Sequence, residues 1–403
     1  MEINEDEFFS SMIDAAAVTD ELRRLVRSGR LRRYWQLPPE ESFKLLGIDA
    51  GLVDYERARL DWYGPLEIWR DPEHEVSDIL FNGPAGDPFF VVQRGVMLNT
   101  GVIVHPQWIA WVRQQLLLRS GKFAEHSDGT PSLPLAQGVA DRMRFAATRP
   151  PATPSGISLA VRLLPERWHT LGDLVQAGTI TREASDLLQE ALACGASVLV
   201  AGATGSGKTT LTAALTQAIG RRKRLVLIED GGELPRSANS LHVEVLDGTG
   251  AFSRAVTFAL RQKPDHIVVG EVRGGEAIAL LQAAATGHPG IGTIHAGSVQ
   301  GALRNLERMA LLGLAAESGG GQAAAQIVRG LITSDIVSLI VVQIGRTPAD
   351  QRAVLAIEEV LRQGGQGQSG DPFPSNPLFQ HDPASGGLVR VGNVNGAWGL
   401  GRL

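Results

Sequence analysis

The sequence is poor in cysteine and in long apolar runs, and both absences exclude classes of protein. Among its 403 residues Cys194 is the single cysteine, which excludes an intramolecular disulfide framework and a cysteine-ligated metal cluster and suits a reducing cytosol. No uncharged apolar run approaches the roughly 18 residues of a membrane-spanning helix. The acidic start MEINEDEFFS lacks the basic and apolar regions of a signal peptide. We therefore expect a cytoplasmic protein that associates with a membrane only through partners.

Positive charge and aromatic side chains are also scarce. The chain carries 38 Lys and Arg against 43 Asp and Glu, a net charge of −5 at pH 7, and 5% of its residues are aromatic. Proteins that bind nucleic acid usually present a basic surface, with aromatic rings where they stack on single strands. These values argue against direct nucleic-acid binding, although a local basic patch stays compatible with them. The length predicts two or three domains.

Patterns along the first half of the chain predict three segments. Residues 1–74 are charged and helix-like, and we interpret them as a helical N-terminal extension. Residues 75–162 contain short β-rich runs separated by Gly and Pro, together with one helix, which indicates a smaller α/β domain. Trp108 and Trp111 on that helix are predicted to be packing residues. Residues 163–184 are predicted to form a helical connector.

The second half alternates between strands and helices. SVLVAG, RLVLIED, HIVVGE and GIGTIH each precede or follow a helical segment, which predicts a mostly parallel, helix-covered sheet over residues 185–362. DIVSLIVVQIG and RAVLAIEEVL are expected to add strands to it. Residues 363–403 form a Gly/Pro-rich tail, whose first part cannot bury enough apolar surface to fold alone. We expect a hairpin in GLVRVGNVNGAW with its turn at Asn395-Gly396.

The stretch GATGSGKT matches the phosphate-binding pattern G-x-x-x-x-G-K-[ST] between a predicted strand and a predicted helix, which is the context that the pattern needs. Its glycines allow backbone N–H groups to surround the β-phosphate, and the helix N-terminus adds partial positive charge. Lys208 is predicted to reach the β- and γ-phosphates, and the Thr209 hydroxyl to ligate Mg²⁺. A chance glycine-rich turn is the alternative. The residues predicted to bind ATP here are Gly202, Ala203, Thr204, Gly205, Ser206, Gly207, Lys208, Thr209 and Thr210.

Carboxylates follow at the ends of the next two predicted strands. Glu229, Asp230 and Glu233 lie in LIEDGGEL, and the carboxyl ends of parallel strands face the ligand crevice. One of these groups could orient the attacking water and accept its proton. Glu271 ends HIVVGE where a metal-coordinating Asp usually sits, so we expect it to hold a water bound to Mg²⁺. Solvated acids in exposed turns are the alternative for both stretches.

The stretch TGHPGIGTIHAGS places His288 and His295 seven residues apart. GIGTIH is predicted to be a strand that ends at His295, one helix after Glu271. We interpret His295 as a group that hydrogen-bonds the γ-phosphate and relaxes after hydrolysis. A satisfied core histidine is the alternative. A metal site would need further ligands, and neither a nearby cysteine nor an H-x-E arrangement supplies them.

Taken in order, GATGSGKT, IEDGGEL, VVGEVRGGEA and TGHPGIGTIH resemble the Walker A, Asp, Walker B and His boxes of the secretion and pilus-motor traffic ATPases. That superfamily serves type II secretion, type IV pili, type IV secretion and Tad/Flp pili. Upstream, VSDILFNGP with VVQRG and RFAATRPPATPSGISLAVR resemble segments of the family's N-terminal domain. TGHPG and VRGGEA are most similar to the Tad/Flp and conjugal-transfer branch. The resemblance implies an α/β fold with a C-terminal RecA-like P-loop ATPase domain.

The resemblance also implies roles for single residues. It assigns Glu233 as the catalytic base and Glu271 to Mg²⁺ or its water, and it places His288 and His295 in the His-box role. The arginines that would contact phosphates across a domain or subunit interface are Arg144, Arg162 and Arg149. A guanidinium suits this task because it stabilises charge on the transferring phosphoryl group. This chain departs from the family pattern at Gly297, since many relatives have HANS where it has HAGS.

For the whole protein, the resemblance implies a homohexameric ring that hydrolyses ATP with Mg²⁺. The ring would work on an inner-membrane platform protein and lie at the cytoplasmic face of that membrane. We expect it to power pilus assembly or retraction, or protein secretion, in a Tad/Flp-type pilus. A type IV secretion or conjugal-transfer ATPase is the alternative. A RecA-like nucleic-acid motor and a nucleotide-bound scaffold that does not hydrolyse are the remaining alternatives.

Overall fold

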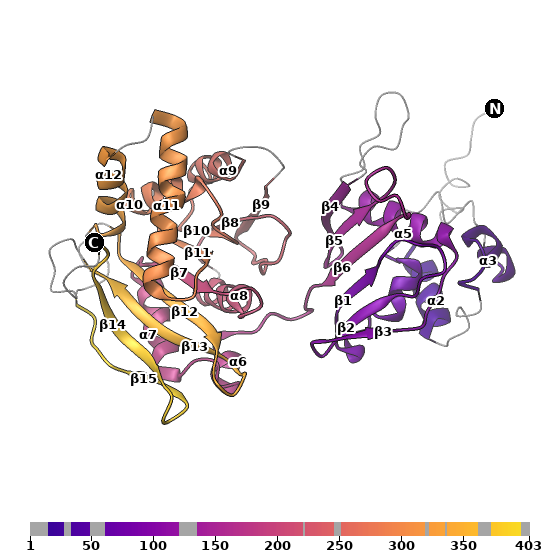
Figure 1. Ribbon diagram of the computed structural model, residues 1–403, viewed down its shortest axis with the longest axis horizontal. Helices are drawn as coiled ribbons and strands as arrows, with labels where there is room; N and C mark the ends of the chain where they lie inside the picture. Colours follow the sequence, from indigo (N-terminus) through magenta and orange to yellow (C-terminus); the bar gives the residue numbers. More distant parts are fainter. Residues whose placement is uncertain are drawn as a thin grey trace. The chain divides into compact units, whose positions relative to one another are not determined.

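The computed structural model of the protein divides the chain into two compact units, Met1–Glu166 and Arg167–Leu403 (Figure 1). Among the described helices, none combines the length and apolar character that crossing a bilayer requires. The residues that the structure describes are 15–27, 34–48, 61–120, 135–220, 222–245, 251–318, 322–334, 337–361 and 372–395.

The first unit is built on an antiparallel sheet with the strand order β3-β2-β1-β6-β5-β4. Side chains alternate between the two faces of a strand, and in β5 the buried residues are accordingly Met143, Phe145 and Ala147. One face of this sheet therefore packs into the hydrophobic core. The strands are β1 (Val76–Phe81), β2 (Phe90–Gln93), β3 (Val96–Asn99), β4 (Leu135–Ala140), β5 (Met143–Thr148) and β6 (Ser158–Leu163).

Helices complete this core with a group of buried tryptophans. The Trp35 and Trp108 rings lie 4.9 Å apart between centroids, and those of Trp62 and Trp111 lie 5.2 Å apart. Edge-on aromatic pairs of this kind bury much apolar area, so the described part of residues 1–74 shares the core of the sheet. The predicted packing role of Trp108 and Trp111 is confirmed. The helical elements are α2 (Ala15–Arg27), α3 (Pro39–Leu45), η1 (Gly64–Ile68), η2 (Pro72–His74) and α5 (Pro106–Arg119).

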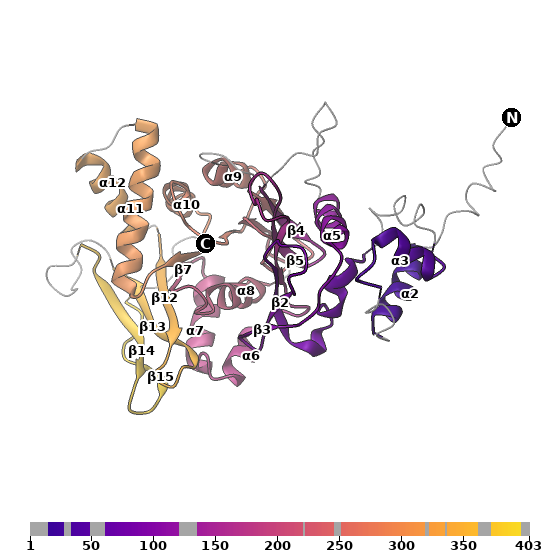
Figure 2. The same cartoon turned by 45° about the vertical axis from the view of Figure 1, so that its right-hand side comes forward.

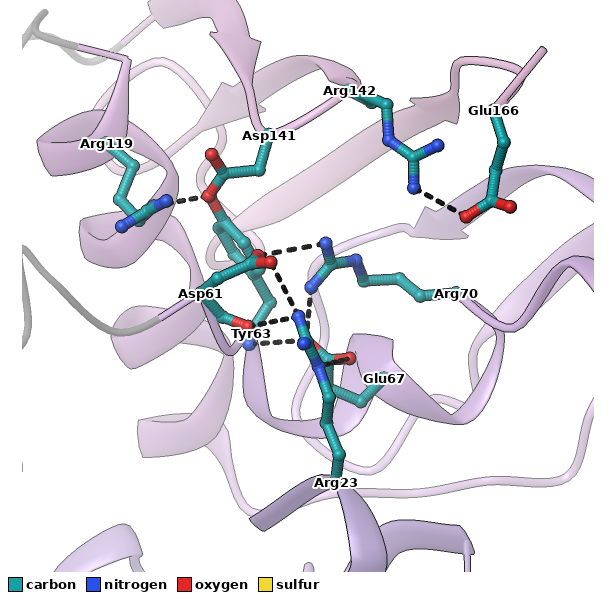
Figure 3. A network of polar contacts seen from close by, with 9 residues as sticks. All are labelled: Arg23, Asp61, Tyr63, Glu67, Arg70, Arg119, Asp141, Arg142 and Glu166. Carbon is teal, nitrogen blue, oxygen red and sulfur yellow. Dashed lines mark hydrogen bonds and ion pairs between the residues drawn. The ribbon is translucent and has the colours of Figure 1, made fainter. Parts of the chain in front are cut away.

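A polar network ties residues 61–70 to the sheet (Figure 3). The Tyr63 hydroxyl donates to Asp141 over 2.7 Å, and Asp141 also pairs with Arg119. Burial, followed by the hydrogen bond to Asp141, raises the pKa of Tyr63. Glu67 pairs with Arg70 at 2.5 Å, and burial raises the pKa of Glu67 although the guanidinium opposes that shift. Because Asp141 lies in the turn between β4 and β5, the network fastens that turn to the preceding segment.

The second unit contains a mixed sheet with the order β15-β14-β13-β12-β7-β11-β10-β8-β9. The strands from β12 to β9 in that order pair in parallel, and β13, β14 and β15 are added antiparallel. The strands are β7 (Ser197–Gly202), β8 (Leu225–Glu229), β9 (Ser240–Glu244), β10 (His266–Val269), β11 (Gly290–His295), β12 (Leu339–Arg346), β13 (Arg352–Val360), β14 (Ser375–Asp382) and β15 (Gly387–Arg390).

Helices cover both faces of this sheet, as Figure 2 shows. In β7, Val198 and Val200 belong to the core under α6, α7 and α8, whereas Leu199 and Ala201 belong to the core under α9 to α12. A parallel sheet buried on both faces needs such continuous apolar strands, so the predicted parallel, helix-covered sheet is confirmed. The helices are α6 (Leu171–Gln176), α7 (Arg182–Ala193), α8 (Lys208–Ala218), α9 (Ala251–Leu260), α10 (Glu276–Ala285), α11 (Val299–Ser318) and α12 (Gln322–Ile332).

The segments on either side of this sheet differ from expectation. Helix α6, within the expected connector 163–184, and helix α7, which begins there, contribute leucines to the core of the second unit, so we propose the boundary near Glu166. The turn expected at Asn395-Gly396 extends beyond the described residues, which end at 395, whereas β15 pairs with β14 in a hairpin. Its turn is stabilised where the Asp382 carboxylate accepts two backbone N–H groups and Gly386 adopts φ +69. Part of the expected tail therefore extends the sheet.

Candidate active site

The carboxyl ends of the parallel strands bring distant motifs to one edge of the sheet. His295, at the end of β11, pairs in register with Gly202, at the end of β7. Glu229 ends β8, and Glu271 follows β10 by two residues. From β7 the chain crosses to β8 on one side of the sheet, and from β11 it crosses to β12 on the other side of β7. Ligands of open α/β sheets bind outside the carboxyl ends of the strands where the direction of the crossovers changes in this way.

The glycine-rich loop connects β7 to α8, which begins at Lys208. Gly205 and Gly207 have φ angles of +72 and +102, a left-handed backbone that glycine adopts without steric cost. A Cβ on Gly202 would lie 2.4 Å from the Ile344 carbonyl oxygen of β12, so the neighbouring strand leaves room only for glycine. Both the conformation and the packing of the loop thus depend on its glycines.

Lys208 lies folded against this loop. Its Nζ donates to the Gly202 and Ala203 carbonyls over 3.0 and 2.9 Å, and it lies 3.5 Å from Nδ1 of His295. Burial lowers the pKa of Lys208, while the negative charge of Glu271 opposes that shift. Carbonyl oxygens are weaker partners for an ammonium than an anion is, so a phosphate would compete well for this side chain.

The first turn of α8 offers further ligands for a phosphate and a cation. Thr209 and Thr210 are half-buried there, and the first N–H groups of a helix lack partners within it, which favours a bound anion. The hydroxyl of Thr209 and the carboxylate of Glu271 are the oxygen ligands that Mg²⁺ prefers. Within the described ranges, no three or more His, Cys, Asp and Glu side chains form a metal site by themselves. Mg²⁺ would therefore take its other ligands from phosphate and water.

Glu271 lies at the centre of a chain of charged side chains. One carboxylate oxygen lies 2.8 Å from His295 Nε2, and the other accepts from Arg273 at 2.7 Å. Burial would raise the pKa of Glu271, but the hydrogen bond and charge of Arg273, followed by His295 and Lys208, lower it below the usual value. The His295 side chain is 46% exposed, which disagrees with the alternative of a core histidine. Glu271 therefore stays ionised beside an accessible imidazole.

Glu229 and Glu233 occupy different environments. Glu229 is 5% exposed, and its carboxylate accepts the backbone N–H groups of Glu233 and Leu234 over 2.7 and 3.0 Å. It also lies 3.2 Å from Nδ1 of His242. A buried carboxylate with these partners is satisfied by the turn and holds it in place. We therefore assign Glu229, expected among the catalytic groups, to positioning the half-buried Glu233.

His288 lies at the other end of β11 from His295. The strand rises about 3.4 Å per residue, so its five steps separate its two ends by about 17 Å. The His288 N–H donates to the Ala283 carbonyl over 2.9 Å, where it closes the end of α10. The strand therefore carries His288 and His295 to opposite edges of the sheet, and the His-box role of His288 stays a prediction.

Two amides that sequence reasoning missed hold the turn after His295. Asn305 of α11 donates to the His295 carbonyl, and Gln343 of β12 donates to the Gly297 carbonyl, both over 2.8 Å. Amides from two other elements thus hold the backbone around Gly297. No spacing in the sequence signals either residue, since each reaches the turn only through the sheet and the helix packed on it.

The predicted arginines lie in the first unit, whereas the loop and the acids lie in the second. Arg144 and Arg162 face each other in register on β5 and β6, and Arg149 follows β5 directly. Arg162 donates to Asp78 on β1 over 3.1 Å. Neighbouring strands therefore bring Arg144 and Arg162 together, and Asp78 offsets the charge of Arg162.

The sheet order, the glycine loop and the lysine that follows it define a RecA-like P-loop fold. Residues 128–357 match the model of the type II/IV secretion system protein family. This match spans more than half of the chain, which therefore belongs to that family.

Individual relatives match over shorter stretches. The chain is 44% identical over 135 residues to the type IV secretion system protein PtlH of Bordetella pertussis, covering 31% of this chain and 40% of that protein. It is 36% identical over 171 residues to the conjugal transfer protein TrbB of Rhizobium radiobacter, covering 41% and 52%. The chain spans about half the length of the curated relatives it matches.

A solved structure supports the fold alone. The pilus retraction motor PilT with bound ADP is 22% identical to this chain. The comparison covers 75% of this chain and 84% of that one, with a TM-score of 0.57. The similarity of fold therefore extends well beyond the glycine loop.

Proposed function

We propose that this protein is an ATPase that powers a type IV secretion or conjugal-transfer machine. The observation that carries the proposal is the contact of Lys208, His295 and Glu271 beside the glycine loop. The names of the relatives favour this function over the expected Tad/Flp pilus, because PtlH belongs to type IV secretion and TrbB to conjugal transfer. The Tad/Flp assignment is therefore replaced by the alternative.

The loop and α8 supply the groups that would hold ATP. These residues are the ones expected from the motif, from Gly202 to Thr210. The ammonium of Lys208 would turn from the loop carbonyls to the phosphates. Mg²⁺, held by Thr209 and through water by Glu271, would neutralise charge on the phosphates. The lowered pKa of Glu271 keeps that carboxylate charged for this task at neutral pH.

His295 is connected to both charged neighbours through its two ring nitrogens. Its Nε2 lies 2.8 Å from Glu271, and a neutral imidazole with its proton on Nε2 would present Nδ1 as an acceptor to Lys208. Transfer of Lys208 to a phosphate would remove that donor and leave Nδ1 without it. The imidazole would then respond to the phosphate through Lys208, which supports a sensor role. Glu233, on the turn shaped by Glu229, remains our proposed base for the attacking water.

The assembly belongs to the proposal as well. We infer a homohexamer. In it, Arg144, Arg149 and Arg162 of the first unit would contact phosphates across a domain or subunit interface. The proposed partner is a platform protein of the inner membrane, and the ring would lie at its cytoplasmic face. Family membership supports this arrangement.

Phosphate release from ATP tests the function. Lys208→Ala and Glu271→Ala are each expected to reduce turnover at least about 100-fold, because both remove charge that stabilises the transition state. Lys223→Ala is the matched control, since Lys223 is half exposed and pairs with Asp265 away from the loop. Turnover like wild type in either site variant contradicts the proposal. Strong stimulation by DNA would indicate a nucleic-acid motor, and nucleotide binding without phosphate release a scaffold.

A further inference from the structure

The hairpin formed by β12 and β13 packs against the glycine loop through Ile344 and Arg352. Arg352, the first residue of β13, donates from Nε to the Gly205 carbonyl over 3.1 Å. A Cβ on Gly207 would lie 3.3 Å from Ile344 Cδ1 and 3.7 Å from Arg352 Cδ. The aliphatic part of Arg352 therefore passes along Gly207 while its guanidinium reaches Gly205. With Ile344 also against Gly202, the hairpin contacts the loop at three of its glycines.

Arg352 has a cationic neighbour with a different partner. Arg346, the last residue of β12, lies opposite Arg352 in register. Arg346 pairs with Asp350 at 2.9 Å, whereas no carboxylate among the described residues pairs with Arg352. Like charges directly across a strand pair repel each other. The side chain of Arg352 is exposed, and the partner that the structure gives its guanidinium is the Gly205 carbonyl.

The geometry of the peptide bond gives that contact a consequence. In a trans peptide the C=O and the following N–H point in opposite directions. Because Arg352 binds the Gly205 carbonyl on the side of the hairpin, the Ser206 N–H points away from the hairpin. There it donates to the Ala203 carbonyl over 3.3 Å, the same oxygen that accepts from Lys208. A phosphate could replace this oxygen as the acceptor without disturbing the bond to Arg352.

We propose that Arg352 is a positioning residue of the phosphate-binding loop. It fixes the orientation of the peptide between Gly205 and Ser206, and so reduces the number of conformations that a glycine-rich segment would otherwise sample. A loop that loses less conformational entropy on binding has a higher affinity for its ligand. This inference rests on the proposed nucleotide binding and extends it to a strand about 150 residues away from the loop.

Two measurements on the full chain test this role. The first is hydrogen exchange of the backbone amides of residues 202–210 without nucleotide, which Arg352→Gln is expected to accelerate. The second is the Kd for ADP, expected to rise about tenfold in Arg352→Gln, or about 1.4 kcal/mol at 25 °C, with KM for ATP rising and kcat nearly unchanged. Arg352→Lys is expected to restore most of the affinity, because an ammonium can still donate one hydrogen bond.

Arg346→Gln is the matched control, since it removes the same charge from the same face of the hairpin. We expect it to leave both amide exchange and the Kd for ADP unchanged. Equal effects of Arg346→Gln and Arg352→Gln would overturn the proposal in favour of a general charge effect of the hairpin. Unchanged exchange and affinity in Arg352→Gln would overturn it outright. Failure of the wild-type protein to bind ADP would refute the proposed function, and amide exchange would still decide the contact with the loop.

Discussion

Replacing Glu229 by Gln separates a structural carboxylate from a catalytic one. The Glu229 carboxylate accepts the N–H groups of Glu233 and Leu234. A glutamine has nearly the same shape, and its one amide oxygen can take the place of the oxygen that accepts both N–H groups, so each hydrogen bond keeps an acceptor but loses the charge on it. Hydrogen bonds to charged groups contribute about 1.5–3 kcal/mol each. We therefore expect Glu229→Gln to lower the free energy of unfolding by about 2 kcal/mol.

Thermal unfolding measures this loss. For a unit of this size, about 2 kcal/mol corresponds to a decrease in Tm of roughly 4–8 °C. Turnover is expected to fall as well, because the turn that carries Glu233 is less ordered. The matched variant is Glu233→Gln, in which the half-buried side chain is changed but its backbone N–H still donates to Glu229. It is expected to lose turnover while its Tm falls less than that of Glu229→Gln, because the hydrogen bonds of the turn to the Glu229 carboxylate are kept.

Two outcomes would refute this reasoning. If Glu229→Gln keeps the wild-type Tm and yet loses turnover, Glu229 acts in the chemistry and its hydrogen bonds to the turn contribute little. If Glu233→Gln destabilises the protein as strongly as Glu229→Gln, the two carboxylates form one structural unit and neither can be singled out as the base.

Two further predictions concern the first unit and the turn after His295. Burial would raise the pKa of Asp141, but the hydrogen bonds from Arg119 and Tyr63 lower that pKa below its ordinary value. The stability that the ionised Asp141 contributes is therefore present at neutral pH. It is lost as the pH falls through the pKa of Asp141 in the folded protein. Asp141→Asn should lack this component, and urea unfolding with the same acid dependence as wild type would contradict it. Asn305→Ala removes the donor to the His295 carbonyl and should lower kcat about three- to tenfold at an unchanged Kd for ADP, consistent with about 1 kcal/mol. Gln300→Ala, on the same helix but bonded to the Phe373 carbonyl, is the control, and an equal loss of kcat there would contradict a specific role for Asn305.

Much of the fold could be predicted because its signals are local. Short apolar runs that alternate with helical segments predict a parallel sheet covered on both faces, and the glycine pattern between a strand and a helix predicts a phosphate-binding loop. The turn at Asp382 could not be identified in this way, because Asn395-Gly396 offered a stronger local hairpin signal. Pairing of β15 with β14 reveals the turn at Asp382, since it joins the segment to a large existing sheet.

The sequence by itself predicted which residues bind phosphate and at which strand ends they lie. Parallel strands bring their carboxyl ends to one edge, so Lys208, Glu271 and His295 could be placed together without a structure. Only the tertiary structure distinguished the buried Glu229 from Glu233, because burial and backbone hydrogen bonds depend on the path of the turn. Likewise, only the structure linked Arg352 to the glycine loop. Contacts between strands far apart in the chain leave no periodic pattern, and packing alone determines them.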